Sequence, residues 1–162
     1  MADFMRVEDL QVYQKLCRLH IEITTLTRSW PVEERFELAS QIRRSSNSSP
    51  AQLAEKHSDR HVRNKIEGVN RSRGEALETV HHLYIAKLKS YLGEDQYESY
   101  RARYLECVRM LNGLERTLER QLDAVLRRWP SKVADSSSSS DPEPRTPNPE
   151  PFTRDARGDR TC

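Results

Sequence analysis

A glutamate and two histidines in the middle of the chain have the spacing of a possible metal site. Glu78 precedes His81 by three positions and His82 by four, which places the three side chains on neighbouring turns of a helix. Di-iron helical bundles use such a Glu-x-x-His pair on each of two helices. No other histidine in this chain follows a glutamate by three residues, so the second pair is missing. We therefore expect no metal site.

The sequence also lacks the motifs typical of nucleophilic catalysis and of phosphate transfer. There is no glycine-rich phosphate loop, no nucleophile elbow and no paired-cysteine motif. The spacing of Cys17, Cys107 and Cys162 suggests neither a disulfide framework nor a zinc site, so we expect three reduced thiols. The sequence thus predicts a protein that is not an enzyme and needs no cofactor.

The strongest chemical signal is a local excess of positive charge. Six basic residues against two acidic ones give residues 56–73 a net charge of +4, whereas the whole chain carries +2. Arg35, Arg43 and Arg44 extend this excess toward the N-terminus. A polyanion such as RNA is a natural partner, and without a matching row of exposed aromatic residues the contacts should be mainly to phosphates. The residues that we predict to bind nucleic acid are Arg43, Arg44, Arg60, Arg63, Lys65, Arg71 and Arg73.

An alternative is that these charges only solvate the surfaces of helices. Glu67 lies four residues from both Arg63 and Arg71, and a pair at this spacing contributes about 0.2 to 0.5 kcal/mol. Part of the basic region would then be neutralised within its own helix. The charge pattern alone leaves both interpretations open.

The elements that position these residues follow from apolar side chains that recur every three or four positions. Four helices are expected, over residues 7–28, from Val32 onward, over residues 61–92 and over residues 95–129. Pro31 suits a helix start, and Pro50, which follows five polar residues, should break or kink the second helix. Gly93 is the expected stop of the third helix. Short connections and the absence of a credible strand predict an all-α, up-and-down four-helix bundle.

The expected core-facing residues of the second and third helices follow from the same spacing. They are Phe36, Ala39 and Ile42 in the second helix, and Val62, Ile66, Val69, Leu77, Val80, Tyr84 and Leu88 in the third. Gly74 and Gly113 fall inside helices, where glycine costs about 1 kcal/mol relative to alanine, so we expect a neighbouring helix to approach closely at both. Arg73 falls on the apolar stripe and would either pair with a carboxylate such as Glu55 or Glu78 or reach out to solvent.

The chain of 162 residues divides by composition into two parts. Residues 1–129 contain the expected helices, whereas residues 130–162 are rich in serine and proline and are expected to be disordered. No apolar run approaches the roughly 20 residues needed to cross a membrane, and the N-terminus lacks the pattern of a secretion signal. We therefore expect a cytoplasmic protein.

Several segments in their order along the chain resemble a known family. They are Leu10-Gln11-Val12-Tyr13, Pro31-Val32-Glu33-Glu34-Arg35, Gln41-Ile42-Arg43-Arg44, Pro50-Ala51-Gln52-Leu53-Ala54-Glu55, Gly74 with Glu78 and Ile85-Ala86, and Arg109-Met110-Leu111-Asn112-Gly113-Leu114. This ordered set resembles the four-helix bundle proteins encoded in intervening sequences of bacterial 23S ribosomal RNA genes. On this basis the residues with an expected structural role are Pro31, Pro50, Glu55, Gly74, Glu78 and Gly113.

The resemblance implies a homopentameric ring with a positively charged surface and no known catalysis. A related group is the accessory variability determinant of diversity-generating retroelements, which binds a reverse transcriptase and RNA. The sequence therefore predicts a non-catalytic, oligomeric scaffold that binds RNA or another nucleic acid. The alternatives are an accessory subunit of a reverse transcriptase, and a purely structural oligomer.

Overall fold

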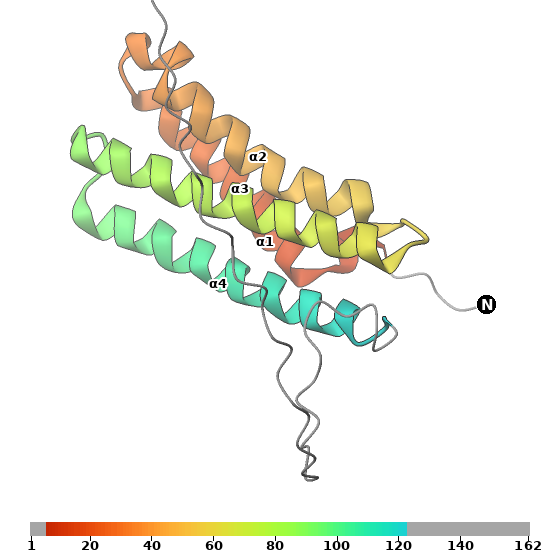
Figure 1. Ribbon diagram of the computed structural model, residues 1–162. Coiled ribbons are helices and arrows are strands. Elements are labelled where there is room, and N and C mark those ends of the chain that lie inside the picture. The colour runs from red at the N-terminus through yellow and green to blue at the C-terminus, as the bar shows by residue number, and fades with distance from the viewer. Residues whose placement is uncertain (1–5, 123–162) are drawn as a thin grey trace, which may run out of the picture. The chain divides into compact units, whose positions relative to one another are not determined.

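The computed structural model describes residues 6–122, and most of them lie in four α-helices. These are α1 (Gln11–Leu26), α2 (Leu38–His57), α3 (Val62–Leu88) and α4 (Glu94–Glu119), with short 3-10 helices η1 (Val7–Asp9), η2 (Thr27–Ser29) and η3 (Val32–Phe36). Consecutive α-helices run in opposite directions and lie side by side (Figure 1). No strand occurs within residues 6–122, so the expected all-α, up-and-down bundle is confirmed there. The predicted boundary at residues 129/130 and the Ser/Pro-rich tail lie outside the described residues.

Helices α1 and α4 each bury one apolar face. The buried residues are Val12, Leu16, Leu19 and Ile23 in α1, and Tyr97, Tyr104, Cys107 and Leu111 in α4. Each stripe recurs at intervals of three, four or seven residues, so it occupies one face of its helix. Full burial of one such aliphatic side chain stabilises a fold by about 1.5 to 3 kcal/mol. None of the helices within residues 6–122 is long and apolar enough to cross a membrane.

Helix α3 turns a different face to the core from the one that its large apolar residues predict. Leu77, Tyr84 and Leu88 are 44%, 43% and 61% exposed, so their expected burial is wrong. The buried residues of α3 are Gly68, Val69, Ser72, Ala76, Thr79, Leu83 and Ala86. Most of these are small, and small side chains allow a neighbouring helix to approach closely. The close packing of α2 on α3 therefore decides which face of α3 is inside.

The glycine at the closest approach of two helices is Gly68, which the sequence analysis did not select. A Cβ atom at Gly68 would lie 2.5 Å from Cβ of Lys56 and 3.0 Å from the main-chain oxygen of Gln52, both in α2. Gly74 and Gly113 are exposed, and a Cβ atom at either would have no neighbour within 4 Å. The expectation that a neighbouring helix of the same chain contacts Gly74 and Gly113 is therefore wrong.

Helix α2 continues without interruption through its serine-rich stretch and through Pro50. The sequence predicts a break or a kink at Pro50, and a break is wrong, because residues on both sides of Pro50 belong to one helix. Ser45, Ser46 and Ser49 are buried on the face that also carries Ile42 and Leu53. Burial against α3 offsets the poor helix propensity of serine and of an internal proline.

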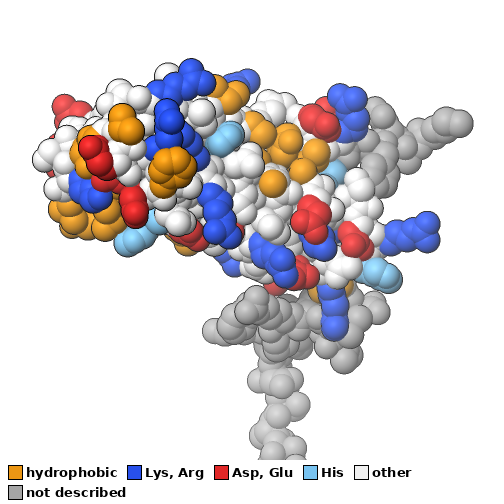
Figure 2. All heavy atoms as spheres, turned by 90° about the horizontal axis from the view of Figure 1, so that it is seen from above, with side chains coloured by type: hydrophobic (Ala, Val, Ile, Leu, Met, Phe, Trp, Pro, Cys, Tyr) orange, Lys and Arg blue, Asp and Glu red, His pale blue; other side chains and the backbone are white. Residues whose placement is uncertain are grey.

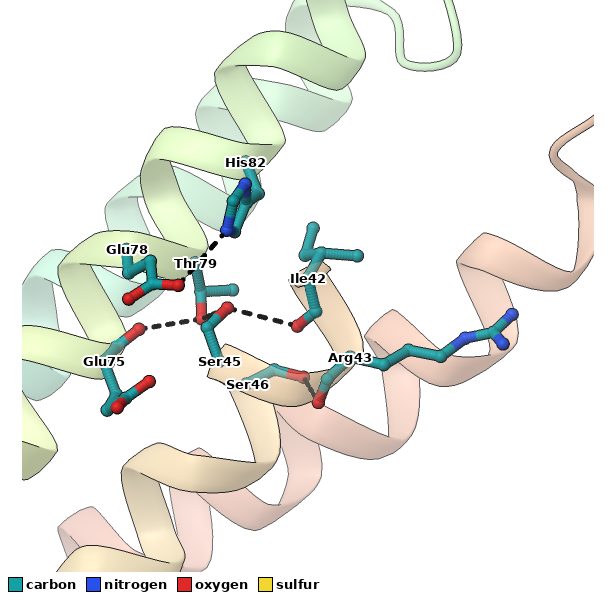
Figure 3. Close-up of polar contacts among 8 residues, drawn as sticks. All are labelled: Ile42, Arg43, Ser45, Ser46, Glu75, Glu78, Thr79 and His82. Carbon is teal, nitrogen blue, oxygen red and sulfur yellow. Dashed lines mark hydrogen bonds and ion pairs between the residues drawn. The ribbon is translucent and has the colours of Figure 1, made fainter. Parts of the chain in front are cut away.

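Buried hydroxyl groups connect α2 to α3 and α1. The Ser49 hydroxyl donates to the main-chain oxygen of Ser72 at 2.8 Å, and the Thr79 and Ser45 hydroxyl oxygens lie 2.9 Å apart. Ser46 lies 2.9 Å from Nδ1 of His20 in α1. We refer to Ser45, Ser46, Ser49, Ser72 and Thr79 as the hydroxyl seam, part of which is drawn in Figure 3. Because each hydroxyl has a partner, the seam avoids the cost of an unsatisfied buried polar group.

The second helical segment begins as a 3-10 helix, and only Leu38 starts the α-helix. Pro31 precedes η3 as expected for a helix start, but Phe36, which was expected in the core, is 83% exposed. Glu34 is the buried residue of η3 and accepts hydrogen bonds from the Leu38 amide at 3.1 Å and the Tyr91 hydroxyl at 2.9 Å. A buried carboxylate therefore holds this segment against the α3–α4 turn, and the expected burial of Phe36 is wrong.

The turn between α3 and α4 starts at Ser90 and not at the expected stop, Gly93. Ser90 has a φ of 61°, and the amide of Tyr91 donates to the carbonyl of Ala86 at 2.9 Å, which is the hydrogen bond of a Schellman motif. Gly93 instead precedes the first residue of α4. Helix α4 ends at Glu119, and the predicted extension of this helix to residue 129 lies mainly outside the described residues.

Candidate nucleic-acid interface

The seven residues predicted to bind nucleic acid come from α2, the α2–α3 turn and the first half of α3. Arg43 and Arg44 belong to α2, Arg60 lies in the turn, and the remaining four lie on α3. Figure 2 shows basic side chains dispersed over one face of the molecule, with acidic side chains among them. The structure therefore does not gather the seven into one dense cluster, and each has to be considered by its own contacts.

Arg71 and Arg73 are neutralised by carboxylates. Arg71 forms an ion pair with Glu67 one turn away, at 2.6 Å, as the alternative interpretation of the charges predicts. Arg73 pairs with Glu115 of α4 at 2.5 Å and also donates to Oδ1 of Asn112 at 2.7 Å. These two side chains are the least available to an external phosphate.

The partner of Arg73 differs from the two carboxylates that the sequence suggested. Glu55 lies 3.1 Å from Lys56 and Glu78 lies 3.4 Å from His82, so neither contacts Arg73. Glu115 is only 13% exposed and lies across the α3–α4 interface, 42 positions away in sequence. Arg73 therefore joins α3 to α4, which is a structural role.

Arg44, Arg60 and Arg63 keep their charges available. All three are exposed, and within residues 6–122 none has a carboxylate partner. Arg63 lines a shallow surface depression on α3 together with Arg71 and Arg73. Glu67 lines the same depression, where it pairs with Arg71. Arg63 is the arginine of this depression that has no carboxylate partner among the described residues.

Lys65 and Arg43 face two other cavities. Lys65 lines an apolar cavity of about 300 Å³ together with Leu53, Val69 and Leu114. The Nε atom of Arg43 donates to the Thr27 hydroxyl at 2.6 Å, at the edge of a cavity between α1, η3 and α2. Neither residue therefore shares a surface depression with Arg63.

One histidine and one serine are close enough to suggest nucleophilic chemistry, but their burial excludes it. Nδ1 of His20 lies 2.9 Å from Oγ of Ser46, a separation suited to a base and its nucleophile. Ser46 is 0% exposed, so no substrate can reach its hydroxyl. Burial also lowers the pKa of His20, because desolvation penalises the charged imidazolium. The pair belongs to the packing of α1 on α2.

The remaining titratable groups that could do chemistry are isolated or protonated. Nε2 of His82 lies 3.4 Å from Glu78, and residues 6–122 contain no group of three metal-ligating side chains (Figure 3). Burial raises the pKa of Cys107 to about 11 and also raises the pKa of Cys17. Both thiols therefore stay protonated at neutral pH and are poor nucleophiles.

Comparisons with known proteins identify the family and the fold. A family model described as 23S rRNA-intervening sequence protein matches residues 8–113. A crystal structure of a protein of unknown function from the S23 ribosomal protein family of Bacteroides thetaiotaomicron superposes with a TM-score of 0.58 at 23% sequence identity. The alignment covers 64% of this chain and 97% of that one, so the two share the fold. No curated protein matches this sequence.

Proposed function

The chain belongs to the 23S rRNA-intervening sequence protein family, and from that premise we propose that it is a non-catalytic RNA-binding scaffold that acts as a homopentamer in the cytoplasm. Its mechanism is electrostatic. Basic side chains repeated around a ring produce a field that one chain lacks, and they contact the phosphates of the RNA backbone. Such contacts fix position and contribute affinity, but they carry little sequence information.

The observation that carries this proposal is the group of uncompensated arginines Arg44, Arg60 and Arg63. All three are exposed: Arg60 lies in the α2–α3 turn, Arg63 in the first turn of α3, and Arg44 in the first half of α2, away from that turn. An arginine that has no carboxylate partner can donate all the hydrogen bonds of its guanidinium group to a phosphate. We no longer include Arg71 and Arg73 among the proposed RNA contacts, because each would first have to break its ion pair with a carboxylate.

Self-assembly is supported by an apolar stripe on the outside of α3. Leu77, Tyr84 and Leu88 are spaced by seven and four residues, so they share one face of the helix and remain exposed. Gly74 lies three residues before Leu77 and has open space where a side chain would be. A stripe of this kind is suited to packing against a second copy of the chain, with Gly74 admitting the partner closely.

RNA binding can be tested by measuring affinity at several salt concentrations. The variant R44Q/R60Q/R63Q removes the three uncompensated charges. The variant R18Q/R109Q/R116Q removes three other exposed arginines that are likewise without an ion pair among the described residues, and it is the matched control. For single-stranded RNA, loss of three phosphate contacts should reduce the slope of log affinity against log salt by about 2. The control should retain most of the slope.

Two outcomes would count against the proposal. If R44Q/R60Q/R63Q bound RNA with the wild-type affinity and salt dependence, these arginines would not form the interface. If both triple variants lost binding equally, the effect would come from net charge and not from this surface. The relation to retroelements stays a prediction, and a reverse-transcriptase gene beside this gene would favour it.

A further inference from the structure

A second basic site lies away from the α2–α3 turn, in a cavity of about 370 Å³ between the end of α1, η3 and α2. Three arginines line it, namely Arg28, Arg35 and Arg43, and no carboxylate does. We refer to these three residues and their cavity as the arginine pocket. Three like charges around one partly enclosed space repel each other, and a bound anion relieves that repulsion.

Arg43 is held in place without being neutralised. Its Nε atom donates to the Thr27 hydroxyl at 2.6 Å, and that hydroxyl, itself buried, donates to the main-chain oxygen of Ile23 at 2.9 Å. The two terminal nitrogens of Arg43 have no partner among the described residues. Thr27 is uncharged, so this contact orients the guanidinium group and leaves its full positive charge.

The buried carboxylate nearest in sequence, Glu34, is bound away from the pocket. Glu34 binds Lys89 and the Tyr91 hydroxyl, and the hydrogen bond from Lys89 is the main reason that its pKa is lowered. Glu33 and Glu37 do not line the pocket. The buried carboxylate of η3 is therefore bound at the α3–α4 turn and is not available to neutralise the pocket arginines.

Neither the helix dipole nor a carboxylate among the described residues balances the three positive charges. Arg28 and Arg35 are exposed and have no ion-pair partner within residues 6–122. The last carbonyls of α1 carry a partial negative charge of about half an elementary charge, which cannot balance three guanidinium groups. Trp30 forms an apolar wall of the same cavity.

We propose that the arginine pocket binds a phosphate monoester. Such a group carries nearly two negative charges at pH 7 and three oxygens that accept paired hydrogen bonds from arginine. The cavity volume lies at the lower end of the range for small-ligand sites, which suits a phosphate with one attached sugar and base. This chemistry occurs both in free nucleotides and at the 5′ end of RNA.

The test compares the full chain with R28Q/R35Q, which removes two exposed pocket arginines, and with R109Q/R116Q, which removes two exposed arginines of α4 as a matched control. Adenosine 5′-monophosphate and inorganic phosphate are titrated while the fluorescence of Trp30 is recorded in a Trp129→Phe background, which leaves Trp30 as the sole tryptophan. A 5′-phosphorylated RNA oligonucleotide is compared with the same oligonucleotide ending in a 5′-hydroxyl. We expect at least a tenfold preference for the phosphorylated probe, and we expect R28Q/R35Q alone to abolish it.

The arms of the experiment distinguish the two sources of the phosphate. A preference for phosphorylated RNA that R28Q/R35Q removes identifies an RNA end, and saturable binding of the mononucleotide alone identifies a free nucleotide. If no probe distinguishes R28Q/R35Q from wild type, the proposal is overturned. R44Q/R60Q/R63Q should keep the phosphate preference, so failure of the proposed RNA surface and failure of the arginine pocket give different results.

Discussion

Gly68 of α3 lies directly against Lys56 of α2, and a Cβ atom at Gly68 would lie only 2.5 Å from the Cβ of Lys56. The atom in the way is the first carbon of the lysine side chain, which moves only if the α2 backbone moves. We predict that Gly68→Ala lowers the free energy of unfolding by about 1 to 3 kcal/mol through overpacking, measured by urea denaturation.

Gly113→Ala is the matched control for Gly68→Ala. Gly113 lies inside α4 with no atom near its missing Cβ, and its backbone does not have a positive φ. The substitution should therefore raise the free energy of unfolding by about 0.5 to 1 kcal/mol, because alanine has the higher helix propensity. Equal effects of both substitutions would show that the contact at Gly68 is unimportant.

The ion pair between Arg73 and Glu115 should couple α3 to α4 energetically. In a double-mutant cycle with Arg73→Gln and Glu115→Gln, we expect a coupling energy of about 1 to 2 kcal/mol, because both side chains are partly buried. The exposed pair Arg71 and Glu67 has similar geometry and should give only about 0.3 to 0.5 kcal/mol. A coupling energy at Arg73 no larger than that at Arg71 would contradict the structural role assigned to Arg73.

His20 should make the stability of the bundle depend on pH. Burial lowers its pKa in the folded state below the usual 6.5, so the unfolded chain binds a proton more readily than the folded one. The stabilising contribution is complete above about pH 6.5 and is lost as the pH falls through the folded pKa. Between pH 7.5 and 5, the free energy of unfolding measured by urea denaturation should therefore fall more for wild type than for His20→Gln. An identical pH dependence of the two proteins would refute the role of His20.

Assembly through the outer stripe of α3 predicts a defined mass. Native mass spectrometry should detect a pentamer of the 18.9 kDa chain, about 95 kDa. Leu77→Glu with Leu88→Glu should dissociate it to monomers that keep their helical circular dichroism spectrum, because both residues are already exposed in one chain. Ile21→Glu, at a residue of α1 that is 65% exposed, should leave the pentamer intact. If Ile21→Glu dissociated the pentamer and the α3 variant did not, the subunit interface would lie on α1 and not on α3.

The number and order of the helices could be predicted from the sequence, because the stripes of α1 and α4 consist of large apolar residues in strict helical spacing. The buried face of α3 could not be predicted from the sequence. Hydrophobicity alone predicts that Leu77 and Leu88 are buried in preference to Ser72, Ala76 and Thr79. Burial there is decided by how closely α2 can approach, and that depends on small side chains in two helices at once. Gly68 shows the same effect, since only its contact with α2 distinguishes it from Gly74.

The position of the basic region could be predicted from the sequence, but which of its arginines are neutralised could not. Net charge along residues 56–73 is a local property of the sequence, whereas the neutralisation of Arg73 depends on Glu115 in another helix. The arginine pocket was missed for a related reason. Arg28, Arg35 and Arg43 lie in three different elements, and their approach depends on the short η2 and η3 segments between α1 and α2.

The hydroxyl seam fixes the register of α2 along α3. Ser45 meets Thr79 and Ser49 meets Ser72, so the contacts run in opposite order along the two antiparallel helices. A slip of one helical turn, about 5.4 Å, would break both contacts. Ser45 and Thr79 would keep their bonds to main-chain oxygens of their own helices, whereas Ser49 would lose its partner in α3, and an unpaired buried hydroxyl costs about 1 to 3 kcal/mol. An all-leucine interface would tolerate several such alignments. Every copy of the chain therefore presents the same outer surface, which a closed symmetrical assembly requires of its subunits.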